Sequence, residues 1–175
     1  NELAQSESFT GKPFANYWMH NGLLDMGGKM SGSVGNVVNI AELLAEETAE
    51  TVRFLLIGTH YRSPINLPAN PEKRAERLAE IRRGLDAFYR RVTREDFYAI
   101  DAPKRKGPFD VPTANEFLAE VGRLRGQFLE SMDDDFNTGG AVGVLFELLT
   151  ALNRFADARK LEEAGAPPDA VAQFK

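Results

Sequence analysis

The second half of the chain repeats apolar residues at steps of three and four, and this spacing limits its possible folds more than any other feature. An α-helix turns once in 3.6 residues, so such steps place the apolar side chains along one helix face. Three stretches, which begin near residues 70, 113 and 137, show the pattern. Each apolar face must be buried against another, which predicts an antiparallel helical bundle in a mainly α-helical chain. The expected inward residues are Leu78, Ile81, Leu85, Phe88 and Val92, then Phe117, Val121, Leu124 and Phe128, then Val142, Leu145, Leu149, Leu152 and Phe155.

Each of these helices also has a recognisable beginning. A short polar side chain before a helix accepts hydrogen bonds from free N–H groups, and proline fits the first helical position. Serine or threonine followed three residues later by glutamate forms a capping box. The expected caps are Asn70 before Pro71, Thr113 with Glu116, and Asn137 or Thr138.

The first 70 residues mix short elements with glycine-rich loops. An aromatic run at 14–20, then Asn21-Gly22, then an apolar run at 23–26 predict a short β-hairpin, because Asn-Gly favours a two-residue turn. Residues 27–36 contain four glycines and are expected to form a loop. Two short helices should follow, one after Asn39 with Leu43 and Leu44 inward, and one from about Thr48 to Thr59 that buries Val52, Leu55 and Leu56.

Composition excludes several classes of protein. The chain has 43% hydrophobic and 27% charged residues, which argues against a mostly disordered protein. It has no apolar run of 18 residues and its first seven residues are polar and acidic, so neither a membrane span nor a secretory leader is expected. Cysteine is absent, which excludes disulfides and thiolate metal sites within these residues and fits a cytoplasmic location.

The charge is unevenly distributed. The net charge of −5 argues against general binding of nucleic acid, but residues 71–106 hold eleven Lys or Arg against seven Asp or Glu. This basic stretch is compatible with local contact to RNA or with a solvated helix face, and we favour the solvated face.

The glycine-rich loop is the best candidate for chemistry. A loop after a strand can bring backbone N–H groups and the ammonium of Lys29 to phosphate oxygens, where positive charge offsets the charge that develops on a transferring or leaving phosphate. Composition alone favours a plain surface turn over such a phosphate loop.

The sequence Lys29-Met30-Ser31-Gly32-Ser33 resembles the Lys-Met-Ser-Lys-Ser signature loop of class I aminoacyl-tRNA synthetases. Residues 17–22 before it, and 60–64 and 132–138 after it, resemble cysteinyl-tRNA synthetase in their order and separations. Residues 1–6 are similar to the end of that family's His-His-Glu-Asn-Glu-x-Ala-Gln-Ser stretch. The resemblance covers nearly the whole chain and implies part of a cysteine–tRNA ligase.

The resemblance implies that the loop closes over ATP, bound with Mg, while cysteine attacks the α-phosphorus to form cysteinyl-adenylate. Lys29, Met30, Ser31, Gly32 and Ser33 would then bind ATP, with Lys29, Ser31 and Ser33 as the catalytic residues. The family's second lysine matches Gly32, which has no side chain. One missing ammonium would cost about 2–4 kcal/mol of transition-state stabilisation. The chain is then a slower variant, manages with Lys29 and backbone N–H groups, or is not catalytic.

The resemblance also implies a zinc site and the partners of the intact enzyme. Glu2 matches a carboxylate that completes this zinc site with two cysteines and a histidine, which lie outside the chain, so no zinc is expected here. The expected partners are tRNA(Cys), cysteine and ATP, and no membrane. The N-terminal nucleotide-binding half of the protein would be missing, so the segment alone is expected to be inactive.

The resemblance divides the chain into three parts. Residues 1–70 would be the end of the catalytic domain with the signature loop and the helices that contact the tRNA acceptor stem. Residues 71–165 would form the antiparallel bundle, and residues 166–175 a linker or the start of a downstream segment. Two alternatives remain. One is a paralogous ligase that joins cysteine to an amino sugar, but residues 132–138 argue against it. The other is a non-catalytic helical module that binds tRNA or protein, and Gly32 supports it.

Three further sites have two interpretations each. Trp18 and His20 would lie near the active-site floor in the family, but we favour an aromatic strand packed on a core. The acidic run Asp133–Asp135 suggests a metal site, but we favour capping of the next helix, whose dipole stabilises carboxylates. For Arg62 two roles stay open, a contact with an RNA backbone and an ion pair with a nearby glutamate.

Overall fold

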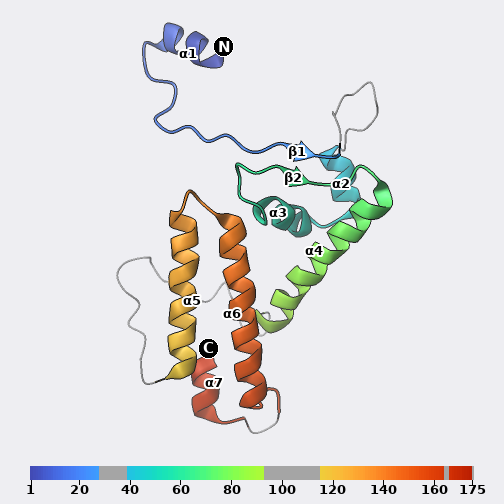
Figure 1. Cartoon of the computed structure of the whole chain (residues 1–175), viewed down its shortest axis with the longest axis vertical. Helices are drawn as coiled ribbons and strands as arrows, with labels where there is room; N and C mark the ends of the chain where they lie inside the picture. The colour runs from blue at the N-terminus through green and yellow to red at the C-terminus, as the bar shows by residue number, and fades with distance from the viewer. Residues whose placement is uncertain (28–38, 93–114, 164–165, 175) are drawn as a thin grey trace.

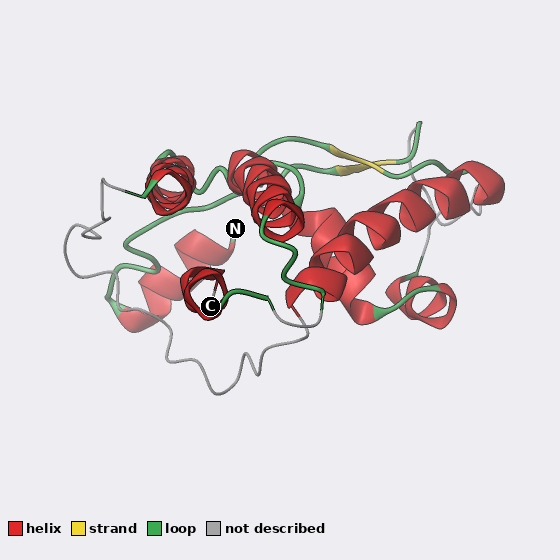
Figure 2. Cartoon of the chain, turned by 90° about the horizontal axis from the view of Figure 1, so that it is seen from below, coloured by secondary structure: helices red, strands yellow, loops and turns green. Residues whose placement is uncertain are grey.

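The computed structural model describes residues 1–27, 39–92, 115–163 and 166–174, and within them the chain is mainly α-helical, as predicted (Figure 1). Figure 2 shows the two short strands together at one edge of the molecule and helices elsewhere. None of the helices in these ranges is long and apolar enough to cross a membrane. The elements are α1 (Glu2–Thr10), β1 (Leu24–Asp25), α2 (Ile40–Glu46), α3 (Ala49–Ile57), β2 (Ile65–Asn66), α4 (Pro71–Val92), α5 (Glu116–Asp133), α6 (Thr138–Ala158) and α7 (Pro168–Phe174).

The two strands pair in parallel, so the predicted β-hairpin is wrong. Residues 14–23 form no strand. Instead, the N–H of Gly22 donates to the carbonyl of Tyr61 at 2.6 Å, and the chain then runs alongside the segment that contains β2. This long-range pairing overrides the local Asn-Gly signal because it buries Met26 and Leu67, which are 5% and 1% exposed. The register places Leu24 opposite Ile65 and Asp25 opposite Asn66.

The helices begin where their caps predict, with one exception. The predicted start of α5 at Thr113 is wrong, because the helix begins at Glu116 behind Asn115, whose side chain accepts from the N–H of Leu118 at 3.1 Å. Thr113 itself lies outside the described residues. The other caps are Asn39 for α2, in a capping box with Glu42, Thr48 for α3, Asn70 for α4 and Asn137 for α6.

A first core lies between α2, α3, the sheet and the beginning of α4. The predicted inward residues Leu44 and Leu56 are wrong, since they are 46% and 48% exposed. Each follows a buried leucine directly, and neighbouring helical residues point about 100° apart, so a short helix with one packing face buries only one of them. The buried core residues are Leu43, Val52, Leu55, Leu67 and Leu78.

A second core lies in the bundle, where α5 and α6 pack side by side in opposite directions (Figure 1). The rings of Phe117 and Phe155 stack with centroids 3.9 Å apart, and Leu124 is 1% exposed. α4 reaches this bundle only near its end, where Phe88 lies 4.8 Å from Phe146 of α6 between ring centroids. The predicted antiparallel packing is therefore confirmed for α5 and α6, while α4 joins the first core to the second.

Residues 1–23, which we call the N-terminal arm, lie outside both cores, and Gly22 and Leu23 at the end of the arm bond the backbone beside β2. α1 contains no buried residue, and Figure 1 shows it away from the other helices. Several large apolar side chains of the arm are exposed, an arrangement that marks interaction surfaces. The exposed apolar side chains of the arm are Leu3, Phe9, Phe14, Tyr17, Trp18, Met19 and Leu23. The described residues thus leave the apolar surface of the arm uncovered.

We predict that Gly22→Ala destabilises the chain. A Cβ at this position would lie 2.1 Å from the carbonyl oxygen of Ser63, and this backbone atom cannot move without shifting the strand pair. The expected loss in the free energy of unfolding is about 1–3 kcal/mol, measured by urea denaturation. Gly126→Ala in α5 is the matched control, because nothing lies within 4 Å of its added Cβ and alanine is the better helix former. An unchanged urea midpoint for Gly22→Ala would contradict the close approach.

Candidate functional site

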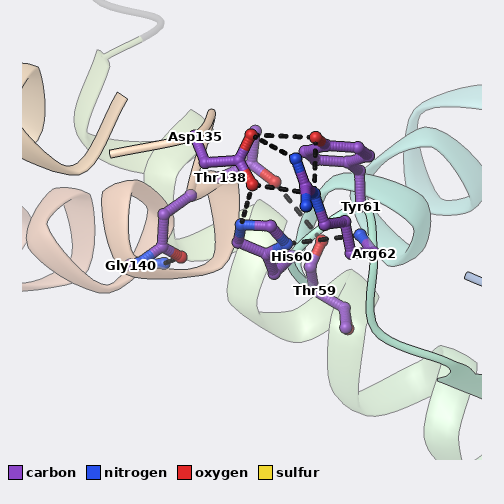
Figure 3. Close-up of polar contacts among 8 residues, drawn as sticks. Thr59, His60, Tyr61, Arg62, Asp135, Thr138 and Gly140 are labelled. Carbon is purple, nitrogen blue, oxygen red and sulfur yellow. Dashed lines mark hydrogen bonds and ion pairs between the residues drawn. The ribbon is translucent and has the colours of Figure 1, made fainter. Parts of the chain in front are cut away.

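Two segments far apart in the sequence meet where the chain turns from α5 into α6. Residues 59–62 follow α3, and Asp135 lies in the connection between α5 and α6. In Figure 3 the side chains of His60, Tyr61 and Arg62 lie around the Asp135 carboxylate. We call these four residues the corner cluster.

The carboxylate of Asp135 accepts two hydrogen bonds on Oδ1 and makes an ion-pair contact with Arg62 on Oδ2. Arg62 Nε lies 2.8 Å from Oδ2, and Arg62 Nη2 donates to Oδ1 at 3.2 Å. The hydroxyl of Tyr61 donates to Oδ1 at 2.9 Å and itself accepts from Arg62 Nε at 2.8 Å. Tyr61 therefore connects the two charged groups, and a two-point contact of this kind fixes their relative orientation.

His60 completes the cluster on the other side of the carboxylate. Its Nδ1 accepts a hydrogen bond from the backbone N–H of Arg62 at 3.2 Å. In the neutral ring the proton then resides on Nε2, which lies 3.8 Å from Asp135 Oδ2. The imidazole also stacks on Tyr61, with ring centroids 5.0 Å apart. His60 therefore packs on Tyr61 and adds only a longer contact to the carboxylate.

The neighbours of Arg62 favour its charged form. The hydrogen bond with the Tyr61 hydroxyl, and after it the negative charge of Asp135, raise the pKa of Arg62 above its ordinary value. The side chains of Arg62 and Asp135 are 63% and 42% exposed, so water screens their attraction. Their contact therefore determines geometry more than it adds stability.

The backbone of the α5–α6 connection is held tightly in place. Asp135 and Phe136 have φ values of 52° and 54°, in the left-handed region that costs non-glycine residues about 1–3 kcal/mol each. The hydroxyl of Thr138 donates to the carbonyl of Thr59 at 3.3 Å. A Cβ on Gly139 would lie 3.3 Å from the carbonyl oxygen of Gly58. The corner is thus packed directly on the end of α3.

The structure assigns a different role to the acidic run than we predicted. Capping of α6 by these aspartates is wrong, because Asn137 is the N-cap and accepts from Gly140 at 2.9 Å. Asp133 is the last residue of α5, Asp134 is its C-cap, and Asp135 binds residues 60–62. The described residues include no group of three His, Cys, Asp or Glu placed to hold a metal ion. Arg62 does pair with a carboxylate, but the carboxylate is that of Asp135.

The signature-loop residues Lys29, Met30, Ser31, Gly32 and Ser33 lie outside the described residues. The loop's flanks are described: Asp25 belongs to β1, and Asn39 caps α2. After β1 the chain turns sharply, because Asp25 Oδ1 accepts from the N–H of Gly27 at 2.8 Å and Gly27 has a φ of 83°. Both ends of the loop are therefore attached to the first core.

The other predicted site residues lie on the N-terminal arm. Trp18 is 52% exposed and stacks on the exposed His20 with centroids 6.1 Å apart, so the favoured interpretation of an aromatic strand packed on a core is wrong. Glu2 is exposed in the first turn of α1. Both Glu2 and His20 line a pocket of about 520 Å³ together with Leu3 and Phe14. A single carboxylate beside one imidazole does not make a zinc site, which needs three or four ligands.

The contact between Asp135 and residues 60–62 was not predicted. Both segments carry the resemblance described above, yet nothing in their spacing indicates that they touch. The available signal was charge complementarity between Arg62 and the acidic run, which was not specific enough to identify the partner.

Two known families match the chain in separate regions. Residues 1–76 match the family described as tRNA synthetases class I (C) catalytic domain, and residues 127–173 match the DALR domain. Because residues 60–62 belong to the first region and Asp135 to the second, the corner cluster joins the two matched regions.

Similar curated proteins are named cysteine–tRNA ligase. The relative from Thermodesulfovibrio yellowstonii is 44% identical over 160 residues, which cover 90% of this chain and 31% of the relative. Those from Halalkalibacterium halodurans and Geobacter sulfurreducens are 39% and 38% identical, over 89% and 94% of this chain and 31% and 32% of theirs. The chain spans about a third of the length of the curated relatives it matches.

We predict that Tyr61→Phe weakens the coupling between Arg62 and Asp135, because it removes the hydroxyl that bonds both. In a double-mutant cycle, Arg62→Ala and Asp135→Ala should be non-additive in thermal unfolding, and less so when Tyr61→Phe is also present. The control is the same cycle on Arg77 and Glu80, an exposed pair within α4 whose coupling should not respond to Tyr61→Phe. Additive effects of Arg62→Ala and Asp135→Ala would contradict the cluster.

Proposed function

We propose that this chain, which belongs to the cysteine–tRNA ligase family of class I synthetases, forms the part of such a ligase that carries the signature loop and the helices behind it. The whole protein would activate cysteine with ATP as cysteinyl-adenylate and transfer it to the terminal ribose of tRNA(Cys) in the cytoplasm. The observation that carries this proposal is the 44% identity to a cysteine–tRNA ligase over 90% of the chain.

The signature loop would act on the triphosphate of ATP. Lys29 would offset negative charge on the phosphates during attack on the α-phosphorus, and Ser31 and Ser33 would hold the closed loop by hydrogen bonds. Met30 and Gly32 would line the same ATP site, where Gly32 leaves one expected ammonium absent. The attachment of both loop ends to the first core supports this proposal, because a closing loop needs fixed ends.

The N-terminal arm would be covered by the remainder of the ligase. A soluble protein rarely exposes so many large apolar side chains on one segment unless another surface covers them. The relatives are about three times as long as the chain, so the remainder of the ligase could supply that surface. Glu2 would contribute to a zinc site only with ligands from that remainder. On this basis residues 1–70 would complete the catalytic domain with the signature loop and the helices that contact the tRNA acceptor stem. Residues 71–165 would form the antiparallel bundle, and residues 166–175 would be a linker or the start of a downstream segment.

One alternative has specific support. Gly32 favours a non-catalytic module that binds tRNA but has lost adenylation. Cysteine-dependent exchange of pyrophosphate into ATP by the full-length protein separates the two functions, since only the enzyme catalyses the exchange. Charging of tRNA rather than of an amino sugar separates the ligase from its paralogue.

We predict opposite effects of two substitutions in the full-length protein. Lys29→Ala should lower cysteine-dependent pyrophosphate exchange by about 10²–10³-fold, the loss typical of one preorganised donor. Gly32→Lys should raise the exchange rate because it restores an ammonium at the phosphates. Lys73→Ala, at an exposed position of α4, is the control and should leave the rate unchanged. No response to Gly32→Lys would show that this position does not touch phosphate, and no exchange by the unmodified protein would favour the non-catalytic module.

A further inference from the structure

We infer that Asp135 is a positioning residue which, through Tyr61 and Arg62, fixes the orientation of the helical region relative to the catalytic region and so supports transfer of cysteine to tRNA more than its adenylation. The inference rests on the proposed function. Its physical basis is the way in which the two matched regions touch.

On the catalytic side, the corner cluster is tied to the sheet. The backbone carbonyl of Tyr61 accepts from Gly22, and two residues after Ser63 the N–H of Ile65 donates to Leu23 at 3.0 Å. A displacement of residues 60–62 would therefore disturb the strand pair from which the chain enters the signature loop. The backbone of the cluster is thus hydrogen-bonded to the residues that lead into β1.

On the helical side, Asp135 sits on a corner that has little freedom. Two successive non-glycine residues in the left-handed region allow few alternative turn shapes. The N–H of Asn137 also donates to the carbonyls of both Ser131 and Asp134, at 3.0 and 3.1 Å. The carboxylate is thus presented in one direction by the ends of α5 and α6.

A second contact between the regions is apolar. Phe146 of α6 lies 6.3 Å from Phe54 of α3 and 4.8 Å from Phe88 of α4, measured between ring centroids. A Cβ on Gly84 would lie 3.2 Å from the Phe146 ring, which shows how closely α4 approaches it. Apolar burial is favourable but has little directional preference, so this contact holds the regions together without fixing the angle between them.

The two contacts together define an orientation. The Phe146 contact acts as the attachment. At the beginning of the same helix α6, the corner cluster, together with the hydrogen bond of Thr138 to Thr59, fixes the rotation about this attachment by hydrogen bonds of defined direction. The exposure of the cluster means that its loss should allow other orientations without unfolding either core. A tRNA that must contact both regions would lose its preorganised site, whereas adenylate formation needs only the catalytic region.

The test uses Asp135→Asn in the full-length protein, with Glu163→Gln as a control at another exposed carboxylate that pairs with a basic side chain. Asp135→Asn should lower kcat/KM for tRNA charging about tenfold, mainly through a higher KM for tRNA, and change pyrophosphate exchange less than twofold, with only a small change in Tm. Arg62→Lys, which keeps the charge but not the two-point geometry, should resemble Asp135→Asn. Equal losses of exchange and charging, or unchanged charging, would overturn the inference.

A second measurement is independent of activity. Spin labels can be attached to genetically encoded unnatural amino acids at Arg53 in α3 and Glu130 in α5, both exposed positions, so that cysteines elsewhere in the full-length protein stay unlabelled. The distribution of label distances should broaden in Asp135→Asn and stay narrow in Glu163→Gln, and an unchanged width would overturn the inference. If the unmodified full-length protein neither exchanges pyrophosphate nor charges tRNA, the proposed function fails, while the distance measurement still decides whether Asp135 fixes the orientation.

Discussion

The arrangement of the first core depends on the alignment of residues 22–26 with residues 61–67. The alignment begins where Gly22 touches the backbone of Ser63 and continues through β1 and β2, burying Met26 and Leu67. It determines where the chain enters the signature loop, and it holds residues 60–62 where they meet the α5–α6 corner. A pair of two-residue strands is weak alone, so its persistence depends on the helices that cover it.

The sequence indicated the helices well because their signals are local. Asn39, Thr48, Asn70 and Asn137 each carry the hydrogen-bonding chemistry that starts a helix, and the caps agree with the structure. The hairpin prediction failed because the structure at this place depends on a contact with a distant segment. Asn21-Gly22 is a local turn signal, but the glycine is needed for close approach to a segment about forty residues away, and such a requirement leaves no mark in the neighbouring sequence.

The site was only partly predictable. Its membership followed from the resemblance, since residues 60–64 and 132–138 were already singled out. Its geometry did not, because which carboxylate meets Arg62 depends on how the bundle sits against α3. Asp133, Asp134 and Asp135 are equivalent as a sequence pattern, yet it is the third that bonds the Tyr61 hydroxyl and the Arg62 guanidinium.

The left-handed residues of the α5–α6 corner have a consequence for how the turn could vary. Glycine would adopt the same backbone angles freely, but it would also adopt many others. Asp135 and Phe136 have fewer accessible backbone conformations than glycine would have. The corner therefore accepts some backbone strain and is restricted to fewer turn shapes. Such a turn holds the angle between α5 and α6 within a narrow range. Glycine substitutions at Asp135 or Phe136 would relieve the backbone strain but would also widen the range of angles between the two helices.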